Sequence, residues 1–403
     1  MADYQTPTPT SASSTQRPLP IFLLALPVLI LLMRYIVVPV FDYPNKDFMT
    51  LWAGGRALID GVDQYSPQGW VPLFHTYQSE WIPNETNPYP IWTSLLMLPF
   101  AFFSVEWGAA LWLAACEVML AWVFWQTPHK LYGRYLTQRQ LFWLFLAGFT
   151  SITNLLILIN GQFTYFLLAV LFAVLLLDKQ RRTFASGMVL TLLLLKPNPF
   201  ILLVPLIGLW LLLHRRWSMI AGGMLGTVLL LVVGEWVQRG WFTQWFAVRS
   251  KAVVVTITPT LWGLAAEISH DNWLWVGLVL VIGFTAVLGW YIFTHPHLPF
   301  PVVIGMAAAG SLLVTPYGWS YEHALLYIPW LWLYIHVKSR QQAHWTFGLI
   351  AWAFPWLMFI IAAIRINDAF GGLVPLSTLM VAGYWSWHNF GSPSRRQVND
   401  VLS

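Results

Sequence analysis

The apolar stretch 183–213 reads TFASGMVLTLLLLKPNPFILLVPLIGLWLLL, and its pattern indicates the fold class of the whole chain. As one helix it would extend about 46 Å, which exceeds the roughly 30 Å hydrocarbon core of a bilayer but is too short for two full crossings. Pro197 and Pro199 interrupt it directly after Lys196, because a residue that precedes proline is pushed out of helical geometry. We therefore expect a broken helix inside a membrane bundle, with a lysine at the break.

The lysine at this break has two interpretations. A positive charge inside a helix bundle is costly unless it is paired, so Lys196 suggests a site for an anionic ligand. Alternatively, its long side chain reaches the outer interface and lies in water. The residues alone leave both open.

The composition extends the membrane interpretation to the rest of the chain. Apolar residues make up 58% of the 403 residues and charged residues 9%, against roughly 25% charged in a typical soluble domain. Many of the 26 Trp residues lie near the ends of apolar runs, where the water–lipid interface favours them. We expect an all-α, polytopic transmembrane helix bundle, with apolar segments near 19–40, 89–103, 107–126, 140–158, 162–177, 183–195, 197–213, 217–234, 273–293, 300–316, 323–336, 346–364 and 372–388.

The positions of the basic residues predict the topology. Thirteen of the 21 Lys and Arg residues occur in six short segments, a distribution typical of cytoplasmic loops, and it places both termini in the cytoplasm. The net charge of +5 therefore encodes topology, and we expect no nucleic-acid partner. Cytoplasmic termini require an even number of crossings, so we expect about 12 spans, with 89–103 or 183–195 as a partial or re-entrant helix. The six segments are Arg17; Lys130, Arg134 and Arg139; Lys179, Arg181 and Arg182; Arg215 and Arg216; Lys338 and Arg340; and Arg395 and Arg396.

The chain divides into one large domain and two tails. Residues 1–18 are rich in Pro, Ser and Thr and predict a disordered cytoplasmic tail. A single transmembrane domain covers 19–388, and 389–403 form a second cytoplasmic tail. Two long loops, 41–88 and 235–272, lie outside the membrane, and the first carries six of the 16 acidic residues with many Pro and aromatic residues. Cys116 is the only cysteine, so an intramolecular disulfide is impossible.

The first external loop contains a predicted interfacial helix that begins at Asp47 and stops at Gly61. Phe48, Leu51, Trp52, Gly55, Leu58 and Ile59 recur at helical spacing and form one apolar stripe. A carboxylate at the start of this helix is placed to take a proton from a bound hydroxyl, as a general base does. Asp is equally a preferred N-cap residue, so Asp47 has a purely structural alternative. Arg56 is expected to be a surface residue.

Three further groups of polar residues interrupt the apolar runs. The turn Tyr317-Gly-Trp-Ser-Tyr-Glu-His323 contains Glu322 and His323, which are suited to binding a phosphate or relaying a proton, although an ordinary interfacial turn has the same composition. Asn160-Gly161-Gln162 precedes a helix, where either a ligand or helix capping explains the polar residues. Glu117 lies within an apolar run, where carboxylates are rare.

Several catalytic signatures are absent from the sequence. It contains no Gly-rich phosphate loop of the Walker kind and no His/Glu pair at zinc spacing. No segment outside the apolar runs is large enough for a nucleotide-binding domain. We therefore do not expect nucleotide-driven chemistry.

The order of these motifs resembles the GT-C glycosyltransferases that use polyprenyl-phosphate sugars, and within them the bacterial branch of polyprenyl-phosphate-mannose-dependent α-mannosyltransferases. The likeness covers roughly residues 45–335. It rests on Asp47-Phe48 with Arg56-Ala-Leu, Gly61 and Tyr65; Tyr89-Pro90; Gly161-Gln162; Ala185-Ser-Gly187 leading to Lys196 and Pro199; Arg215-Arg216-Trp217; and Pro316, Trp319 and His323.

The resemblance implies a function and roles for individual residues. A mannose-like hexose or arabinose would pass with inversion from a polyprenyl-phosphate donor to a glycolipid or glycan acceptor outside the cytoplasm of a bacterial cell. Asp47 would be the general base. Lys196 and His323, with Arg56 and Gln162 as lesser candidates, would stabilise the donor phosphate. Glu322, Asp63 and Tyr89 are candidates for contacts with the acceptor, and no metal or other cofactor is expected.

Two other functions compete with the transferase. A multi-pass transporter or lipid flippase would use the break at Lys196 as an anion site, and a catalytically inactive relative would act as a scaffold. The acidic residues favour the enzyme, because 11 of 16 map outside while the cytoplasmic loops are short. The sequence predicts that Asp47, Lys196 and His323 meet in one outward cavity.

Overall fold

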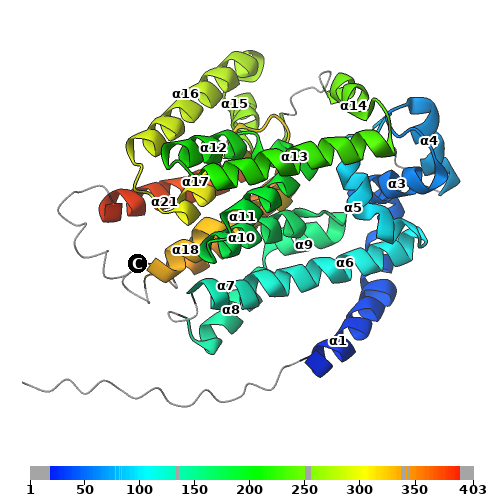
Figure 1. Ribbon diagram of the computed structural model, residues 1–403, viewed down its shortest axis with the longest axis horizontal. Coiled ribbons are helices and arrows are strands. Elements are labelled where there is room, and N and C mark those ends of the chain that lie inside the picture. The colour runs from blue at the N-terminus through cyan, green and yellow to red at the C-terminus, as the bar shows by residue number, and fades with distance from the viewer. Residues whose placement is uncertain are drawn as a thin grey trace, which may run out of the picture.

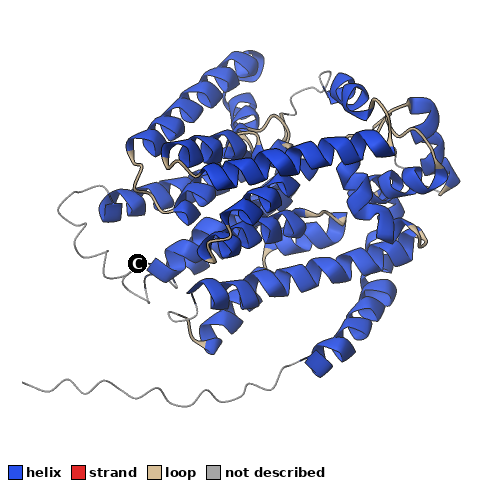
Figure 2. Cartoon of the chain, viewed as in Figure 1, coloured by secondary structure: helices blue, strands red, loops and turns tan. Residues whose placement is uncertain are grey.

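The computed structural model describes residues 19–77, 79, 80, 82, 84–132, 136–249, 256–336, 342 and 345–390. Within these ranges the chain is helical with no β-strand, as Figures 1 and 2 show. The tail expected at 1–18 lies outside the described residues. The tail expected at 389–403 begins inside the last helix, which continues to Phe390, and the remainder lies outside the described residues.

Most of the described helices follow one another closely in the chain, and a longer connection, 77–90, separates α4 from α5. In chain order their bounds are α1 Leu19–Leu32, η1 Met33–Val37, α2 Val38–Phe41, η2 Tyr43–Asn45, α3 Asp47–Asp60, α4 Pro67–Thr76, α5 Ile91–Ala101, α6 Val105–Ala121, η3 Trp122–Gln126, α7 Thr127–Tyr132, α8 Gln138–Phe149, α9 Ile152–Asn160, α10 Thr164–Lys179, α11 Thr183–Leu190, η5 Thr191–Leu195, η6 Asn198–Phe200, α12 Leu203–Leu213, α13 Trp217–Val237, α14 Trp241–Arg249, α15 Leu261–Ser269, η7 His270–Asn272, α16 Trp273–Thr294, α17 Phe300–Val314, η8 Ser320–Leu326, α18 Tyr327–His336, η9 Phe347–Ala353, α20 Phe354–Arg365, η10 Ala369–Gly372 and α21 Leu373–Phe390.

Four helical stretches within the described residues are long and apolar enough to cross a membrane: Val105–Tyr132, Trp217–Val237, Leu261–Thr294 and Phe347–Arg365. A fifth results if α8 and α9, which meet at a bend of 49°, count as one span. The predicted figure of about 12 spans is therefore not confirmed. Many of the remaining apolar segments form helices of 10–17 residues, because prolines and non-α turns interrupt them.

The stretch Leu261–Thr294 contains a reversal. His270 has a φ of 39°, and a Cβ on Gly277 of α16 would lie 2.6 Å from the Trp262 ring of α15. Residues 15 apart in one straight helix would be about 22 Å apart, so α15 folds back along α16. The spanning part of this stretch is therefore α16 alone, with 22 residues.

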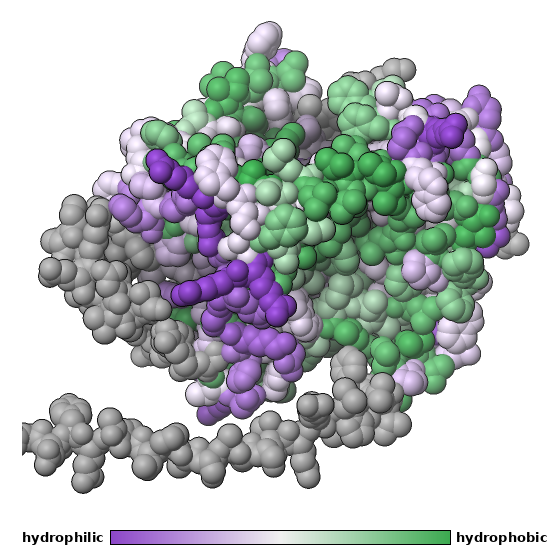
Figure 3. All heavy atoms as spheres, viewed as in Figure 1, coloured by the Kyte–Doolittle hydropathy of each residue, from purple (hydrophilic) through white to green (hydrophobic). Residues whose placement is uncertain are grey.

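The surface has a broad hydrophobic zone. In Figure 3 hydrophobic side chains (green) cover the middle of the visible face, between hydrophilic groups near α7 and α8 and others near α4. Helix α13 crosses this zone and exposes Met224, Val228, Val232 and Trp236, the last with 85% of its surface accessible. Such a belt is what contact with lipid requires, because a soluble protein rarely exposes so large an apolar area.

The two ends of the bundle differ in charge and in chemistry. At one end Lys179 Nζ donates to the carbonyl oxygens of Lys130 (3.0 Å) and Leu131, and Arg216 pairs with Asp178 at 2.8 Å. Helix α10 begins four residues after Asn160 and ends at Lys179, so its 16 residues separate the two ends by about 24 Å. Three of the basic segments that predicted topology therefore gather at one end.

Helix α3 begins at Asp47 and ends before Gly61, as its sequence predicted. Gly61 adopts the left-handed conformation that terminates many helices, with φ 67°. The prediction of a single apolar stripe is wrong, since nine of its 14 residues are buried. Gly54 and Gly55 let it lie directly on α5, where a Cβ at Gly54 would approach Ser94 Oγ to 2.7 Å.

The break in the stretch 183–213 occurs where the prolines predicted it. Helix α11 narrows into the 3₁₀ turn η5, and the backbone leaves helical geometry at Lys196, with φ −137° and ψ 86°. The chain resumes as η6 and then α12. The break places Lys196 inside the protein, with 2% of its surface accessible.

Candidate active site

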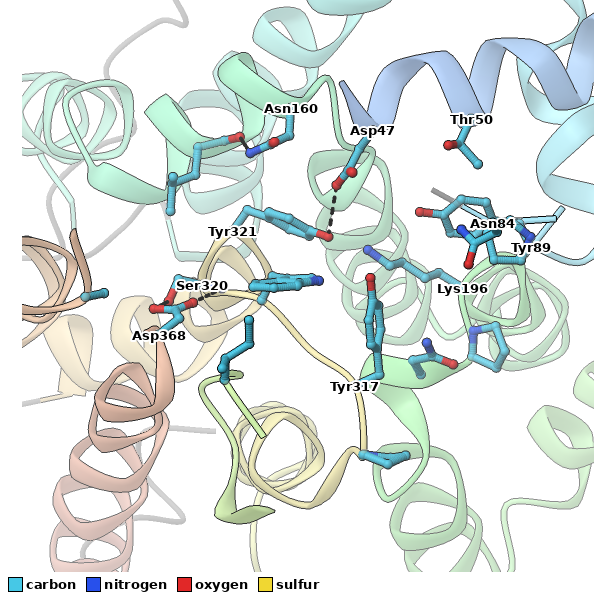
Figure 4. Close-up of a pocket in the computed structure, with 18 of the residues that line it drawn as sticks. Asp47, Thr50, Asn84, Tyr89, Asn160, Lys196, Tyr317, Ser320, Tyr321 and Asp368 are labelled. Atoms are coloured by element: carbon cyan, nitrogen blue, oxygen red, sulfur yellow. Dashed lines mark hydrogen bonds between the residues drawn. The ribbon is translucent and has the colours of Figure 1, made fainter. Parts of the chain in front are cut away.

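A cavity of about 790 Å³ lies at the end of the bundle away from the Lys179 and Arg216 cluster. Segments far apart in the chain line it: the start of α3, the end of α9, the break after η5, the end of α14, the turn 316–321 and the end of α20. Figure 4 shows their polar side chains directed into a common space. Its volume lies within the roughly 300–1,000 Å³ that is typical of ligand pockets.

Asp47 lies on one wall of this cavity. Its Oδ2 accepts a hydrogen bond from Gln162 Nε2 at 2.7 Å and lies 3.5 Å from the hydroxyl of Tyr321. Burial raises the pKa of Asp47, and the hydrogen bond from Gln162 and the charge of Lys196 oppose this shift in part. The N-cap of α3 is Lys46, and no side chain caps this helix end, so the capping explanation for Asp47 loses its support. The carboxylate is thus a half-buried acceptor at the cavity wall.

Gly161 positions Gln162, the hydrogen-bond donor to Asp47. Gly161 has φ 65°, which L-residues with a side chain rarely adopt, and a Cβ there would lie 2.5 Å from the Cβ of Phe48. Asn160 ends α9 and donates its amide to Leu156 O at 2.9 Å, so it does not cap the following helix. The tight turn brings Gln162, which is fully buried, against the start of α3.

Lys196 belongs to the same group of contacts, but it is paired. Its Nζ lies 2.8 Å from Glu322 Oε1 and donates to Gln162 Oε1 at 3.2 Å. It also lies 4.8 Å from the centre of the Tyr321 ring, within the range of a cation–π contact. The two charges are almost completely buried, with 2% and 1% of their surfaces accessible. Lys196 therefore reaches Asp47 through Gln162, and Glu322 neutralises its charge.

A second carboxylate, Asp368, lies in the wall opposite the start of α3. Its Oδ1 accepts the hydroxyl of Ser320 at 2.8 Å, and its Oδ2 accepts the backbone N–H of the same residue at 3.2 Å. Burial raises the pKa of Asp368 to about 6, and the hydrogen bonds from Ser320 oppose the shift in part. In Figure 4 Tyr321 lies between Asp47 and Asp368.

One further cation lines the cavity. Arg249, the last residue of α14, is half-buried. Burial raises the pKa of the Tyr317 phenol, and the nearby charge of Arg249 opposes this shift in part. Within the part of the chain that the structure describes, no carboxylate lies at ion-pair distance from Arg249. Its charge is therefore available to an anion in the cavity.

The other predicted site residues divide into two groups. Tyr89 lines the cavity, as expected for a ligand contact. Arg56, Asp63 and His323 do not line it. Arg56 pairs with Asp60 at 2.7 Å on the far side of α3, and Asp63 accepts from Gln238 Nε2 at 2.7 Å.

His323 points into the bundle interior instead. It borders a small cavity of about 10 Å³ together with Ser151, Thr153 and Tyr327, and its Nε2 is buried without a hydrogen-bond partner among the described residues. The 3₁₀ turn η8 explains the difference, because it directs Tyr321 to the large cavity and His323, two residues later, elsewhere. The predicted meeting of Asp47, Lys196 and His323 is wrong for His323.

Sequence reasoning did not select Asp368, Ser320 or Arg249. Each lies at the end of a helix or in a turn next to an apolar run, where polar residues are common for structural reasons alone. Asp368 was one of the 11 acidic residues assigned to the outer side, which is the one signal that pointed to it. Among the described residues, no group of three or more His, Cys, Asp or Glu side chains is arranged to hold a metal ion.

Comparisons with known proteins identify the family. No curated protein matches the chain significantly. No solved structure matches it either. Residues 87–316, more than half of the chain, match the model of glycosyltransferase family 87, and this range includes Tyr89, Lys196 and Arg249 of the cavity. The chain therefore belongs to glycosyltransferase family 87 and is a membrane glycosyltransferase.

Proposed function

We propose that the protein transfers a sugar, a mannose-like hexose or arabinose, from a polyprenyl-phosphate donor to a glycolipid or glycan acceptor with inversion. The observation that carries this proposal is the position of Asp47, a half-buried carboxylate on a cavity that is also lined by cations. The family supports the transferase over the transporter or flippase that the sequence alone left open. It likewise favours an enzyme over a scaffold.

Asp47 acts as the general base in this reaction. It takes the proton from an acceptor hydroxyl, whose oxygen forms a bond to the anomeric carbon of the donor sugar. The bond between that carbon and the phosphate oxygen breaks, and polyprenyl phosphate leaves with the electron pair. Because the acceptor oxygen attacks the face opposite the phosphate, the configuration at the anomeric carbon inverts. The raised pKa of Asp47 makes it a stronger base than an exposed aspartate.

The leaving phosphate gains a negative charge in this step, since a diester anion becomes a monoester dianion. A cation near the phosphate therefore stabilises the transition state more than the ground state. Arg249 fits this role because its charge is not neutralised by a carboxylate among the described residues, and an Arg fork binds phosphate with two hydrogen bonds. Lys196, paired with Glu322, donates a hydrogen bond to Gln162 and so positions the amide that binds Asp47.

The basic cluster at the other end of the bundle supports an orientation. Basic residues remain on the cytoplasmic side of bacterial membranes, so the cavity faces outward and both termini face the cytoplasm. The donor is then a lipid-linked sugar that has already reached the outer leaflet. The acceptor is an extracytoplasmic glycolipid or glycan.

The test is transfer by the purified full-length protein in lipid nanodiscs. A panel of radiolabelled polyprenyl-phosphate sugars (mannose, arabinose and glucose) is incubated with alkyl glycoside acceptors, and the anomeric configuration of the product is determined by NMR. We expect an inverted product from at least one donor, and a loss of kcat by about 100-fold or more in Asp47→Asn. Asp60→Asn, an exposed carboxylate on the same helix, is the matched control and should retain activity. Wild-type rates in the Asp47→Asn variant would contradict the assignment of the base.

A further inference from the structure

The cavity has two carboxylates, and the proposed reaction uses one. Asp47 is the base, whereas Asp368 lies across the cavity and accepts both of its hydrogen bonds from Ser320. A carboxylate offers about four lone-pair positions, so roughly two remain free on Asp368. Because Asp368 lines the cavity, these positions are accessible to hydroxyl groups of a ligand.

The two carboxylates are connected by neighbouring residues of one turn. Ser320 binds Asp368, and the next residue, Tyr321, places its hydroxyl 3.5 Å from Asp47. This turn therefore fixes the position of Asp368 relative to the proposed base, and both carboxylates line the same cavity. A ligand that binds Asp368 is thereby held in the cavity that contains Asp47.

The charges divide the cavity into two halves. Arg249, whose charge has no carboxylate partner among the described residues, lies on the side of Tyr317, and this half suits the donor phosphate. The half near Asp368 repels a phosphate, and Arg365, three residues before Asp368 in the chain, is paired with Glu267 at 2.6 Å. An uncharged ligand group that donates hydrogen bonds fits this half best.

The surroundings of Asp368 fit such a group. Trp319 also lines the cavity, one residue before the Ser320 that binds Asp368, and contributes an aromatic ring to the wall. The wall continues as an apolar surface that suits a hydrocarbon substituent. It is formed by Phe359 and Ala362 of α20 and by Ile366, which follows that helix. Aromatic rings and a few placed polar groups are the usual composition of a specific pocket.

We propose that Asp368, held by Ser320, forms the acceptor subsite and binds the hydroxyl groups of an uncharged glycosyl residue, whose reacting hydroxyl then lies at Asp47. The inference rests on the proposed function, since it assumes that Asp47 is the base. Asp368 binds and orients the acceptor and takes no part in proton transfer. The glycosyl residue belongs either to a glycolipid or to a soluble glycan.

The first experiment measures binding and does not depend on activity. Octyl and methyl glycosides of mannose, glucose, galactose and arabinose are titrated by calorimetry onto the full-length protein in lipid nanodiscs. We expect at least one glycoside to bind, and Asp368→Asn, which keeps an acceptor for Ser320, to weaken its binding at least about 10-fold. Octyl phosphate should not bind at this subsite. Equal affinity in wild type and Asp368→Asn would overturn the proposal even if the enzyme transfers sugar.

The second experiment separates the acceptor subsite from the catalytic groups. With polyprenyl-phosphate mannose as donor, Asp368→Asn should raise the acceptor KM at least about 10-fold and leave kcat at saturating acceptor within about threefold. The slow hydrolysis of the donor by water, which needs no acceptor sugar, should be unchanged in Asp368→Asn and reduced in Asp47→Asn. A fall in donor hydrolysis or a raised donor KM in Asp368→Asn would overturn the proposal.

Two further variants and one comparison complete the design. Ser320→Ala keeps the carboxylate and one of its two hydrogen bonds, so it should raise the acceptor KM less than Asp368→Asn does. Asp60→Asn is the control for removal of a carboxylate and should change neither KM. If octyl glycosides bind more tightly than methyl glycosides, the acceptor is a glycolipid that uses the wall of α20, whereas equal binding indicates a soluble glycan. A wild type that binds glycosides but transfers none of the donors would contradict the proposed function and not the subsite.

Discussion

The buried pair of Lys196 and Glu322 allows a prediction whose size follows from the structure. The variant Lys196→Met removes the positive charge and leaves Glu322, with 1% of its surface accessible, without its partner at 2.8 Å. At an effective dielectric constant of about 20, charges at this distance attract each other by about 6 kcal/mol before the cost of removing them from water. Breaking such a pair typically costs about 3–5 kcal/mol, because an uncompensated charge stays buried.

The destabilisation of Lys196→Met at pH 7 should therefore be about 3–5 kcal/mol. The double variant Lys196→Met/Glu322→Gln has no buried charge, so its stability should exceed that of Lys196→Met at pH 7.

The assay is unfolding of the full-length protein by SDS in mixed micelles at pH 7, followed by far-UV circular dichroism. Arg56→Met is the matched control, because it breaks the exposed pair with Asp60 and should cost less than about 1 kcal/mol. A penalty for Lys196→Met no larger than that of Arg56→Met, or a double variant no more stable than the single one, would refute the reasoning.

Three further predictions concern catalysis. Burial raises the pKa of Asp47, and the base must be ionised, so kcat should be highest above this pKa and fall as the pH drops through it. This fall should occur at a higher pH than it would for an exposed aspartate. A kcat that stays flat down to pH 4 would exclude Asp47 as the base. Gly161→Ala should destabilise the protein by about 1–3 kcal/mol and lower kcat, because residue 161 has a φ of 65° and the new methyl group would collide with Phe48. An unchanged thermal unfolding temperature would argue against this turn geometry. Arg249→Leu should lower kcat/KM for the donor at least about 10-fold. Arg239→Leu, which removes an exposed arginine ten residues earlier, should not lower it. Equal effects of the two variants would mean that the overall positive charge of this face acts on the donor, and not a contact with Arg249.

Local patterns of the sequence predicted the local features of the protein well. The apolar composition predicted a helical membrane protein, the spacing of apolar residues after Asp47 predicted α3, and Pro197 and Pro199 predicted the break at Lys196. Each of these depends on residues within a few turns of one helix. The predicted count of about 12 spans was not confirmed, because a long apolar run does not reveal where turns divide it.

The sequence by itself determined the class of protein, the start of α3 and the presence of a charged break, since backbone geometry and transfer from water act on neighbouring residues. Only the tertiary structure decided which side chains meet. Glu322 neutralises Lys196 from 126 positions away, Gln162 connects that lysine to Asp47, and Asp368 and Arg249 complete the cavity while His323 turns away from it. These contacts depend on how whole helices pack, and a shift of one residue along a helix turns a side chain by about 100°, which the order of residues does not reveal.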